Sequence, residues 1–318
     1  MKQLRNINAI VLALVMVSVV GCKKDELDDT SVLKDKVWPD SMSYTYDFDC
    51  WLNNNYVKEY NIEFRYRLQD ESTDFSYNLV PAGYEQSQIT AHCVKYLWLD
   101  VYQKQVPNPI FLKLYAPRII NVLGCPAVNA AQNTETMGVA EGGYKITLYN
   151  MNDINHWLPK DGGTPNVAMM NKYIFHVMHH EFSHILHQTK SFPQEYEAIS
   201  AGDYDSQSWQ YKSDTAAYHL GFVTKYSMVE AHEDFVEVIS SYITDSIGQW
   251  KERGFTFSED NTHLISFDEE QPGTKIINRK IDMAKKWLTE KYNITLDSLR
   301  AEVQRRQSAM TYDIVMNN

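Results

Sequence analysis

The segment at residues 180–184 reads H-E-F-S-H, so two imidazoles and a carboxylate stand in the pattern H-E-x-x-H. If this segment is helical, His180 and His184 project from one face, because four residues advance about 40° beyond a full turn. Neutral imidazole is a good Zn²⁺ ligand, so the pair can hold one ion. Glu181 lies about 100° around from His180 and can take a proton from a water that the metal polarises. The pattern therefore predicts a hydrolytic site with one zinc ion per chain.

The surrounding residues predict the helix that this chemistry needs. Residues 167–188 have a helical pattern, with an apolar stripe formed by Ile174, Met178, Phe182 and Ile185. His180 and His184 lie on the flank of this stripe, where the wall of a cleft is expected. A chance H-E-x-x-H in a loop would lack such a stripe.

Three more histidines occupy the same predicted helix. Longer zinc motifs continue with Gly and then His, whereas here His187 is followed by Gln188 and Thr189. We therefore expect His187 to support a ligand or to be exposed. His176 and His179 are expected to be packing or surface residues.

A catalytic zinc site needs a third protein ligand, with a water molecule in the fourth position. A second predicted helix runs from Met228 to about Thr244, with an apolar face of Phe235, Val238, Ile239 and Tyr242. Glu230, Glu233 and Glu237 share its other face at i, i+3 and i+7. The residues alone leave the choice of carboxylate open, with Asp234 as a rival to Glu233 and a plain solvated acidic face as the alternative.

Together, H-E-F-S-H and the segment E-D-F-V-E at residues 233–237 resemble the gluzincin metallopeptidases, including the catalytic domain of anthrax lethal factor. The resemblance implies that Glu233 is the third zinc ligand and that Glu237 orients a ligand histidine. That family also places a catalytic Tyr seven residues before the ligand Glu. Tyr226 has this position and is implied to stabilise the oxyanion together with the metal.

The N-terminal segment is typical of an export signal and is not expected to be part of the folded domain. Lys2 and Arg5 precede an apolar run that ends at Gly21 and is too short for a spanning helix of roughly 20 residues. The segment V-V-G-C at residues 19–22 resembles a bacterial lipobox, which predicts a signal peptide over residues 1–21 and lipid on Cys22. The alternative is an ordinary signal peptide with an incidental Cys.

Residues 22–44 begin with a charged run and predict a flexible tether. An acidic stretch after the Cys resembles the surface-export signal of Bacteroidetes lipoproteins, so we expect an outer-membrane anchor facing the cell surface.

The wider pattern adds H-E-F-S-H-I-L-H-Q and the segment G-F-V-T-K-Y at residues 221–226 to the lipobox. It is similar to the zinc metallopeptidase lipoproteins of Bacteroidetes, also called substrate import-associated zinc metallohydrolases, which accompany outer-membrane nutrient import systems. The resemblance is strongest over residues 174–240 and weak in the N-terminal half. The G-x-M-x-N motif of aminopeptidase-type gluzincins is absent at residues 137–141, which counts against an aminopeptidase.

The elements that must position these residues form two halves. In the first, residues 61–67 predict a strand, residues 87–105 a helix, and residues 109–123 and 144–149 further strands. In the second, residues 276–291 and 296–310 predict helices around a turn at Asn293. We therefore expect one α+β, zincin-like domain over residues 45–318, with an N-terminal mixed sheet and helix followed by a mainly helical half that carries the H-E-x-x-H helix.

Composition argues against a nucleic-acid-binding protein and against a fold held together by disulfides. The formal net charge is −11, and the chain lacks the clustered Lys and Arg that nucleic-acid binding needs. Besides Cys22, only Cys50, Cys93 and Cys125 are present, so at most one internal disulfide can form and the fold is not a disulfide scaffold. The three thiols also lack metal-site spacing.

These observations predict a surface-anchored zinc metallohydrolase, and first of all a metalloendopeptidase that hydrolyses extracellular proteins or glycoproteins. One alternative is a non-catalytic accessory zinc-binding lipoprotein of an outer-membrane nutrient import system, which binds glycan or peptide. Another is a zinc amidase with the same metal chemistry. Glu181 favours an enzyme, because a structural zinc site has no use for a base beside an open position. The sequence leaves peptidase and amidase undecided.

The lipobox generates a direct prediction. We expect the mature protein to partition with the membrane fraction, because lipid on Cys22 anchors it. The Cys22→Ala variant should appear in the soluble fraction, as measured by fractionation and immunoblotting. A Cys22→Ala protein that stays with the membranes would show that the lipobox interpretation is wrong.

Overall fold

The computed structural model describes residues 38–69, 77–106, 108, 110–129, 134–141, 143–268 and 272–318. The chain divides into two compact units, residues 1–49 and residues 50–318. In the described part of the first unit, turns lead into a helix, and the Thr45 hydroxyl donates a hydrogen bond of 2.9 Å to Asp49. The predicted signal peptide, Cys22 and the predicted tether as far as residue 37 lie outside the described residues. No helix in the described ranges has the length and apolar character needed to cross a membrane.

A small mixed sheet lies in the first half of the larger unit, as predicted. Its strand order is β1-β2-β6-β5, in which β1, β2 and β6 are parallel and β5 is antiparallel to β6. Neighbours across the sheet are Phe64, Ile120, Ile146 and Ala140. The strands are β1 (Glu63–Arg65), β2 (Ile119–Val122), β5 (Gly138–Glu141) and β6 (Lys145–Leu148). Two hairpins lie outside this sheet, β3 (Ala127–Asn129) with β4 (Thr134–Thr136) and β7 (Phe255–Phe257) with β8 (Leu264–Ser266).

Helices accompany the sheet in this half. The predicted helix at residues 87–105 is present as the continuous run α4 (Tyr84–Val94), η3 (Lys95–Leu99) and α5 (Asp100–Gln105). The other elements are α2 (Tyr46–Leu52), η1 (Asn53–Val57), α3 (Lys58–Tyr60), α6 (Ile110–Tyr115), η4 (Met151–Asp153) and α7 (Ile154–Trp157).

The strand predicted over residues 109–123 is wrong in its first part, because residues 110–115 form helix α6 and only residues 119–122 form a strand. Phe111 and Leu112 are buried while Ile110 and Leu114 are exposed, so burial does not alternate from residue to residue as it does in a strand. Pro117 then separates helix from strand, since its ring cannot continue a helix.

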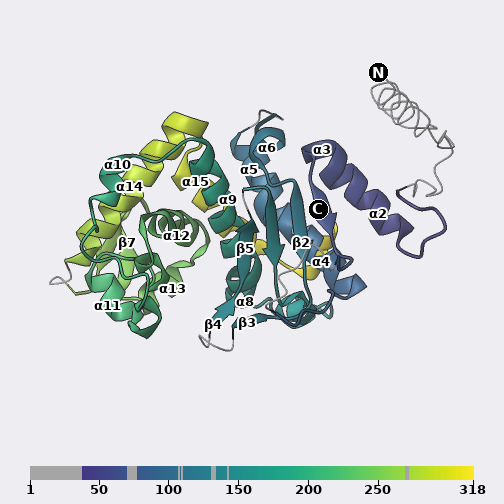
Figure 1. Ribbon diagram of the computed structural model, residues 1–318, viewed down its shortest axis with the longest axis horizontal. Coiled ribbons are helices and arrows are strands. Elements are labelled where there is room, and N and C mark those ends of the chain that lie inside the picture. The colour runs from purple at the N-terminus through teal and green to yellow at the C-terminus, as the bar shows by residue number, and fades with distance from the viewer. Residues whose placement is uncertain are drawn as a thin grey trace, which may run out of the picture. The chain divides into compact units, whose positions relative to one another are not determined.

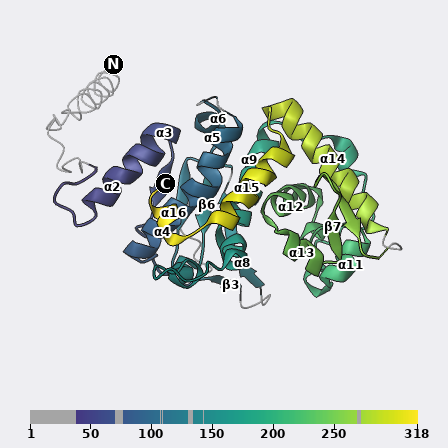
Figure 2. The ribbon, with the colours of Figure 1, turned by 180° about the vertical axis from the view of Figure 1, so that it is seen from behind.

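The second half is helical, as predicted. The run of α8 (Val167–Met170), η5 (Asn171–Phe175) and α9 (His176–Thr189) is continuous and carries the H-E-x-x-H segment. In Figures 1 and 2, α12 is seen nearly along its axis, and it packs against α9, α14 and α15. The remaining elements are α10 (Gln194–Glu197), η6 (Trp209–Tyr211), α11 (Asp214–His219), η7 (Tyr226–Met228), α12 (Ala231–Thr244), α13 (Ile247–Glu252), α14 (Gly273–Tyr292), α15 (Leu296–Ala309) and α16 (Tyr312–Met316). Asn293, at the predicted turn, is left-handed with φ 57°.

Apolar packing fixes the back of α9. The predicted stripe is buried, and Phe182 is fully enclosed. Its ring lies 5.1 Å from that of Trp98 and 4.9 Å from that of Tyr102, measured between centroids, and both pairs are edge-to-face. Such aromatic pairs contribute about 0.5–1.5 kcal/mol each beyond their buried area. The helix therefore cannot rotate its histidines away without opening this cluster.

Apolar packing fixes α12 in the same way. Phe235 is buried, with its ring centroid 4.5 Å from that of Phe192 and 5.1 Å from that of Trp287 on α14. The C-terminal end of α12 is joined to the α8–α9 run, because the Asn171 side chain donates a 2.9 Å hydrogen bond to the Thr244 carbonyl. The two helices are thus held in one relative register.

Candidate metal centre

Three potential ligand atoms from α9 and α12 form a nearly equilateral triangle. The Nε2 atoms of His180 and His184 are 3.2 Å apart. Oε2 of Glu233 lies 3.2 Å from Nε2 of His180 and 3.3 Å from Nε2 of His184. The structure thus brings together the three residues that were predicted to hold the metal.

The triangle fits a zinc ion. Tetrahedral zinc with bonds of about 2.0–2.1 Å keeps its ligand atoms about 3.3–3.4 Å apart. Two imidazole nitrogens and one carboxylate oxygen are also the donor set of many catalytic zinc sites. Both the spacing and the chemistry of the donors therefore match the ion that the motif predicts.

Asp234 points away from this triangle. Its Oδ2 lies 2.7 Å from Nζ of Lys280, and both side chains are fully buried. The Tyr204 hydroxyl donates a further 3.1 Å hydrogen bond to the same oxygen. Asp234 thus forms a buried ion pair with Lys280 on α14. Of the two adjacent acidic residues, Glu233 is the one that faces the histidines.

Glu230, grouped with Glu233 and Glu237 on one predicted helix face, is not part of that face. It is the residue before the first turn of α12, has extended backbone angles and is exposed. The helix therefore begins three residues later than predicted, at Ala231.

Glu237 holds the first ligand histidine from behind. Its Oε1 lies 2.9 Å from Nδ1 of His180, and its Oε2 accepts a 2.8 Å hydrogen bond from the Thr224 hydroxyl. Burial alone would raise the pKa of Glu237, but the neighbouring histidines lower it well below its ordinary value. A carboxylate at this position favours the tautomer with the proton on Nδ1 of His180, which leaves the lone pair of Nε2 available to a metal ion.

His176 corrects the prediction that it is a packing or surface residue. Its Nε2 lies 2.8 Å from the same Oε1 of Glu237 that meets His180. These three residues form a second group that could hold an ion. Their separations of 2.8 and 2.9 Å are hydrogen-bond distances, shorter than the edge of a zinc tetrahedron. The signal in the sequence was the spacing of four between His176, His180 and His184, which places all three on one helix face.

The other two histidines of α9 agree with their predictions. His187 supports a ligand, since its Nε2 lies 3.0 Å from Nδ1 of His184. Burial, together with the neighbouring His184 and His232, lowers the pKa of His187 to about 3, so its imidazole stays neutral and its Nε2 can accept a hydrogen bond from Nδ1 of His184. His179 is a packing residue, fully buried with its Nδ1 3.2 Å from the Tyr102 hydroxyl.

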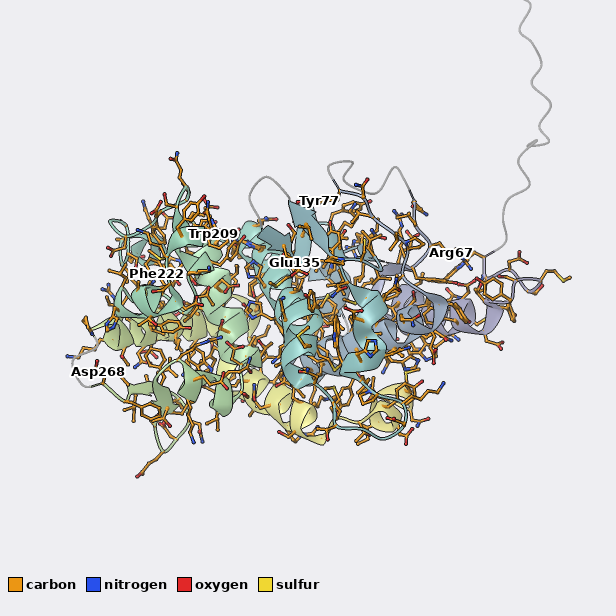
Figure 3. The ribbon with its side chains drawn as sticks, turned by 90° about the horizontal axis from the view of Figure 1, so that it is seen from below. Arg67, Tyr77, Glu135, Trp209, Phe222 and Asp268 are labelled. Carbon is orange, nitrogen blue, oxygen red and sulfur yellow. The ribbon has the colours of Figure 1, made fainter. Side chains whose placement is uncertain are left out.

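A cavity of about 550 Å³ adjoins the triangle, and His180, Glu181 and Tyr226 all line it. One wall comes from the sheet half and includes Glu135, and the other comes from the helical half and includes Trp209 (Figure 3). The predicted base and the predicted phenol therefore face one space together with a metal ligand.

The phenol of Tyr226 is held in its protonated form. Burial raises its pKa, and the negative charges of Glu233, Glu237 and Glu181 raise it further. Its ring centroid lies 6.1 Å from that of His180. A protonated phenol at this position can donate a hydrogen bond into the cavity.

The described cysteines, Cys50, Cys93 and Cys125, are all free thiols. They contribute no ligand to the metal-binding groups found among the described residues. The centre therefore depends on histidine and carboxylate ligands alone within the described ranges.

Comparisons with known proteins also indicate a zinc-binding peptidase. A family model described as "Putative zinc-binding metallo-peptidase" matches residues 42–297. The crystal structure of a putative zinc-binding metallo-peptidase from Bacteroides caccae is similar to this chain, with 36% sequence identity and a TM-score of 0.67. That similarity covers 86% of this chain and 97% of the other. A search of the curated proteins gave no match.

The triangle predicts how the glutamates of α12 and Glu230, which precedes it, differ in their effect on zinc binding. Glu233→Ala should weaken zinc binding by more than the roughly 10- to 100-fold that is typical for losing a group behind a ligand. Glu237→Ala should fall within that range, because it removes only the support of His180. Glu230→Ala is the matched control and should bind zinc as the wild type does. Competition with a chelating dye measures all three, and full zinc affinity in Glu233→Ala would remove Glu233 from the site.

Proposed function

Because the chain belongs to the family of putative zinc-binding metallo-peptidases, we propose that it is a zinc metalloendopeptidase acting on extracellular proteins or glycoproteins. The observation that carries the proposal is the triangle of His180, His184 and Glu233 beside a cavity that Glu181 also lines. A structural zinc site is closed by four protein ligands, whereas three ligands beside a cavity leave a position for water and substrate.

His180, His184 and Glu233 would hold the zinc ion. When bound there, zinc supplies Lewis acidity, which polarises a carbonyl group and makes a water molecule more acidic. Glu237 and His187 keep the two ligand imidazoles oriented from behind.

Glu181 is the general base of the proposed reaction. It is buried, follows the ligand His180 directly on α9 and lines the cavity. Its carboxylate would take the proton from the attacking water and pass it to the leaving amine. This proton transfer is the help that a positioned carboxylate gives to hydrolysis.

Tyr226 is the proposed hydrogen-bond donor to the oxyanion. The carbonyl oxygen of the substrate gains negative charge as the tetrahedral centre forms, and a neutral phenol can stabilise that charge. The three carboxylates around Tyr226 keep its proton in place until then.

The edge strand β5 supports a peptide substrate. Among the described strands it pairs only with β6, and Gly138 at its start lines the cavity. An extended peptide can add to such an edge through main-chain hydrogen bonds. A substrate bound in this way would enter the cavity that His180 and Glu181 line.

We also propose that lipid on Cys22 anchors the enzyme in the outer membrane, facing the cell surface. The support is the lipobox and the charged run that follows it. In that position the enzyme would meet extracellular proteins and could work beside a nutrient import complex.

The role of Glu181 predicts a clean separation of metal binding from turnover. Glu181→Gln should bind one zinc ion per chain, because the residue is no ligand, and should hydrolyse peptides at least roughly 100-fold more slowly. Metal analysis and a fluorogenic peptide library, each with and without chelator, provide the measurement. Wild-type turnover in Glu181→Gln would eliminate it as the base, and chelator-resistant turnover would contradict a zinc mechanism.

The role of Tyr226 predicts a loss confined to the rate. Tyr226→Phe keeps the ring and should fold and bind zinc normally. Its kcat should fall by about 10²- to 10³-fold, the scale for one oxyanion donor, with little change in KM. Steady-state kinetics on one peptide measure this. Unchanged kcat would leave Tyr226 with a packing role only.

A further inference from the structure

The hydroxyl of Thr224 makes hydrogen bonds in two directions, one towards the metal centre and one towards the turn that carries Tyr226. It donates a 2.8 Å hydrogen bond to Oε2 of Glu237. An ionised carboxylate can only accept, so the single hydroxyl proton of Thr224 is committed to Glu237. The Thr224 oxygen therefore accepts from the backbone N–H of Ser227 and from the Ser227 hydroxyl, both at 3.2 Å. The one donor and both acceptor positions of this hydroxyl are thus in use.

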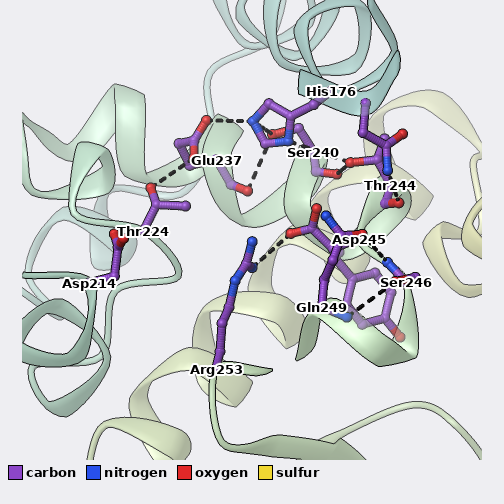
Figure 4. Close-up of polar contacts among 12 residues, drawn as sticks. His176, Asp214, Thr224, Glu237, Ser240, Thr244, Asp245, Ser246, Gln249 and Arg253 are labelled. Carbon is purple, nitrogen blue, oxygen red and sulfur yellow. Dashed lines mark hydrogen bonds and ion pairs between the residues drawn. The ribbon is translucent and has the colours of Figure 1, made fainter. Parts of the chain in front are cut away.

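On the side of the metal centre, Thr224 orients the buried carboxylate of Glu237. Oε1 of Glu237 lies 2.8 Å from Nε2 of His176 and 2.9 Å from Nδ1 of the ligand His180. Figure 4 shows Glu237 between Thr224 and His176. A carboxylate group is planar, so a donor on Oε2 limits the directions in which Oε1 can point. The hydroxyl of Thr224 therefore acts on the zinc ligand through the carboxylate that supports it.

On the other side, the same hydroxyl holds the short helix η7, which begins with Tyr226. Ser227 directly follows Tyr226 in the chain and is fully buried. Threonine hydroxyls commonly fix a turn by accepting from a nearby backbone N–H in this way. The ring of Trp209 lies edge-to-face against Tyr226, with centroids 5.1 Å apart. The phenol is therefore held by an aromatic neighbour and, through the next residue, by Thr224.

We propose that Thr224 is a positioning residue whose single hydroxyl holds the support of a zinc ligand and the oxyanion donor in one fixed geometry. The inference rests on the proposed function, since Tyr226 contributes to the rate only if the site stabilises an oxyanion. Zinc and the phenol would act on the same carbonyl oxygen, and such groups have to be held within about 0.5 Å of the productive geometry. A hydroxyl shared by both supports couples the positions of His180 and Tyr226.

The first test separates the hydroxyl of Thr224 from its methyl group. Thr224→Val keeps the shape and removes the hydroxyl, whereas Thr224→Ser keeps the hydroxyl and removes the methyl group. At saturating zinc, kcat of Thr224→Val should fall by about 10-fold or more with little change in KM, because the loss of such support typically costs about 10- to 100-fold. Thr224→Ser should stay close to the wild type. Wild-type kcat in Thr224→Val, or an equal loss in both variants, would overturn the inference.

Two further variants complete this test. Thr289→Val is the matched control, because the Thr289 hydroxyl donates a 3.2 Å hydrogen bond to the Ile294 carbonyl beyond the end of α14. It should keep the wild-type kcat and zinc affinity. If Thr224→Val does not fold, Thr224→Ala replaces it, since Thr224→Ala and Thr224→Ser differ only in the hydroxyl.

The second test asks whether Thr224 acts through Tyr226. Thr224→Val is combined with Tyr226→Phe, and kcat is measured for both single variants and for the double variant at saturating zinc. In the Tyr226→Phe background there is no phenol hydroxyl to misplace, so Thr224→Val should cause little further loss. Losses that multiply in the double variant would overturn the inference and leave the peptidase proposal standing.

The third test needs no substrate and therefore separates the inference from the proposed function. By competition with a chelating dye, Thr224→Val should bind zinc up to about 10-fold more weakly than the wild type. In the Glu237→Ala background the same substitution should have little effect, because the carboxylate that it orients is gone. If the wild type hydrolyses no peptide, the proposed function fails and this zinc cycle decides the inference. Wild-type zinc affinity in Thr224→Val, or an undiminished effect in Glu237→Ala, would overturn it.

Discussion

The register between α9 and α12 is the constraint on which the rest of the structure depends. Each helix presents two side chains one turn apart, His180 and His184 on α9 and Glu233 and Glu237 on α12. Glu233 completes the triangle of ligand atoms while Glu237 meets the back of His180. A shift of either helix by one turn would break both contacts at once. The metal centre and its support are thus two consequences of one helix pairing.

Apolar packing and buried charge both maintain this register. Phe182 anchors α9 against Trp98, and Phe235 anchors α12 against Trp287. The buried pair of Asp234 and Lys280 joins α12 to α14, because leaving either charge alone in the interior would be costly. Asp234 and Glu233 are adjacent, yet Asp234 contacts Lys280 and Glu233 contacts the two histidines. This is possible because neighbouring residues on a helix point about 100° apart. The packing of the core therefore also fixes the positions of the histidines and Glu233, which the proposed chemistry needs.

The helical half could be read from the sequence because its signals are local. The stripe through Phe182, the turn at Asn293 and the spacing of His180 and His184 each follow from helix geometry within one segment. The choice of Glu233 over Asp234 needed the position of Lys280, which is 46 residues away from Asp234 in the chain. His176 was misread because its role depends on a contact with Glu237 on another helix.

The proposed chemistry depends on one zinc ion held by His180, His184 and Glu233. Anomalous diffraction at the zinc edge from crystals of zinc-loaded protein tests it most directly. The structure predicts one strong peak per chain, about 2.0–2.1 Å from Nε2 of both histidines and from Oε2 of Glu233. A principal peak between His176, His180 and Glu237 would contradict the account, as would the absence of a peak at full zinc loading.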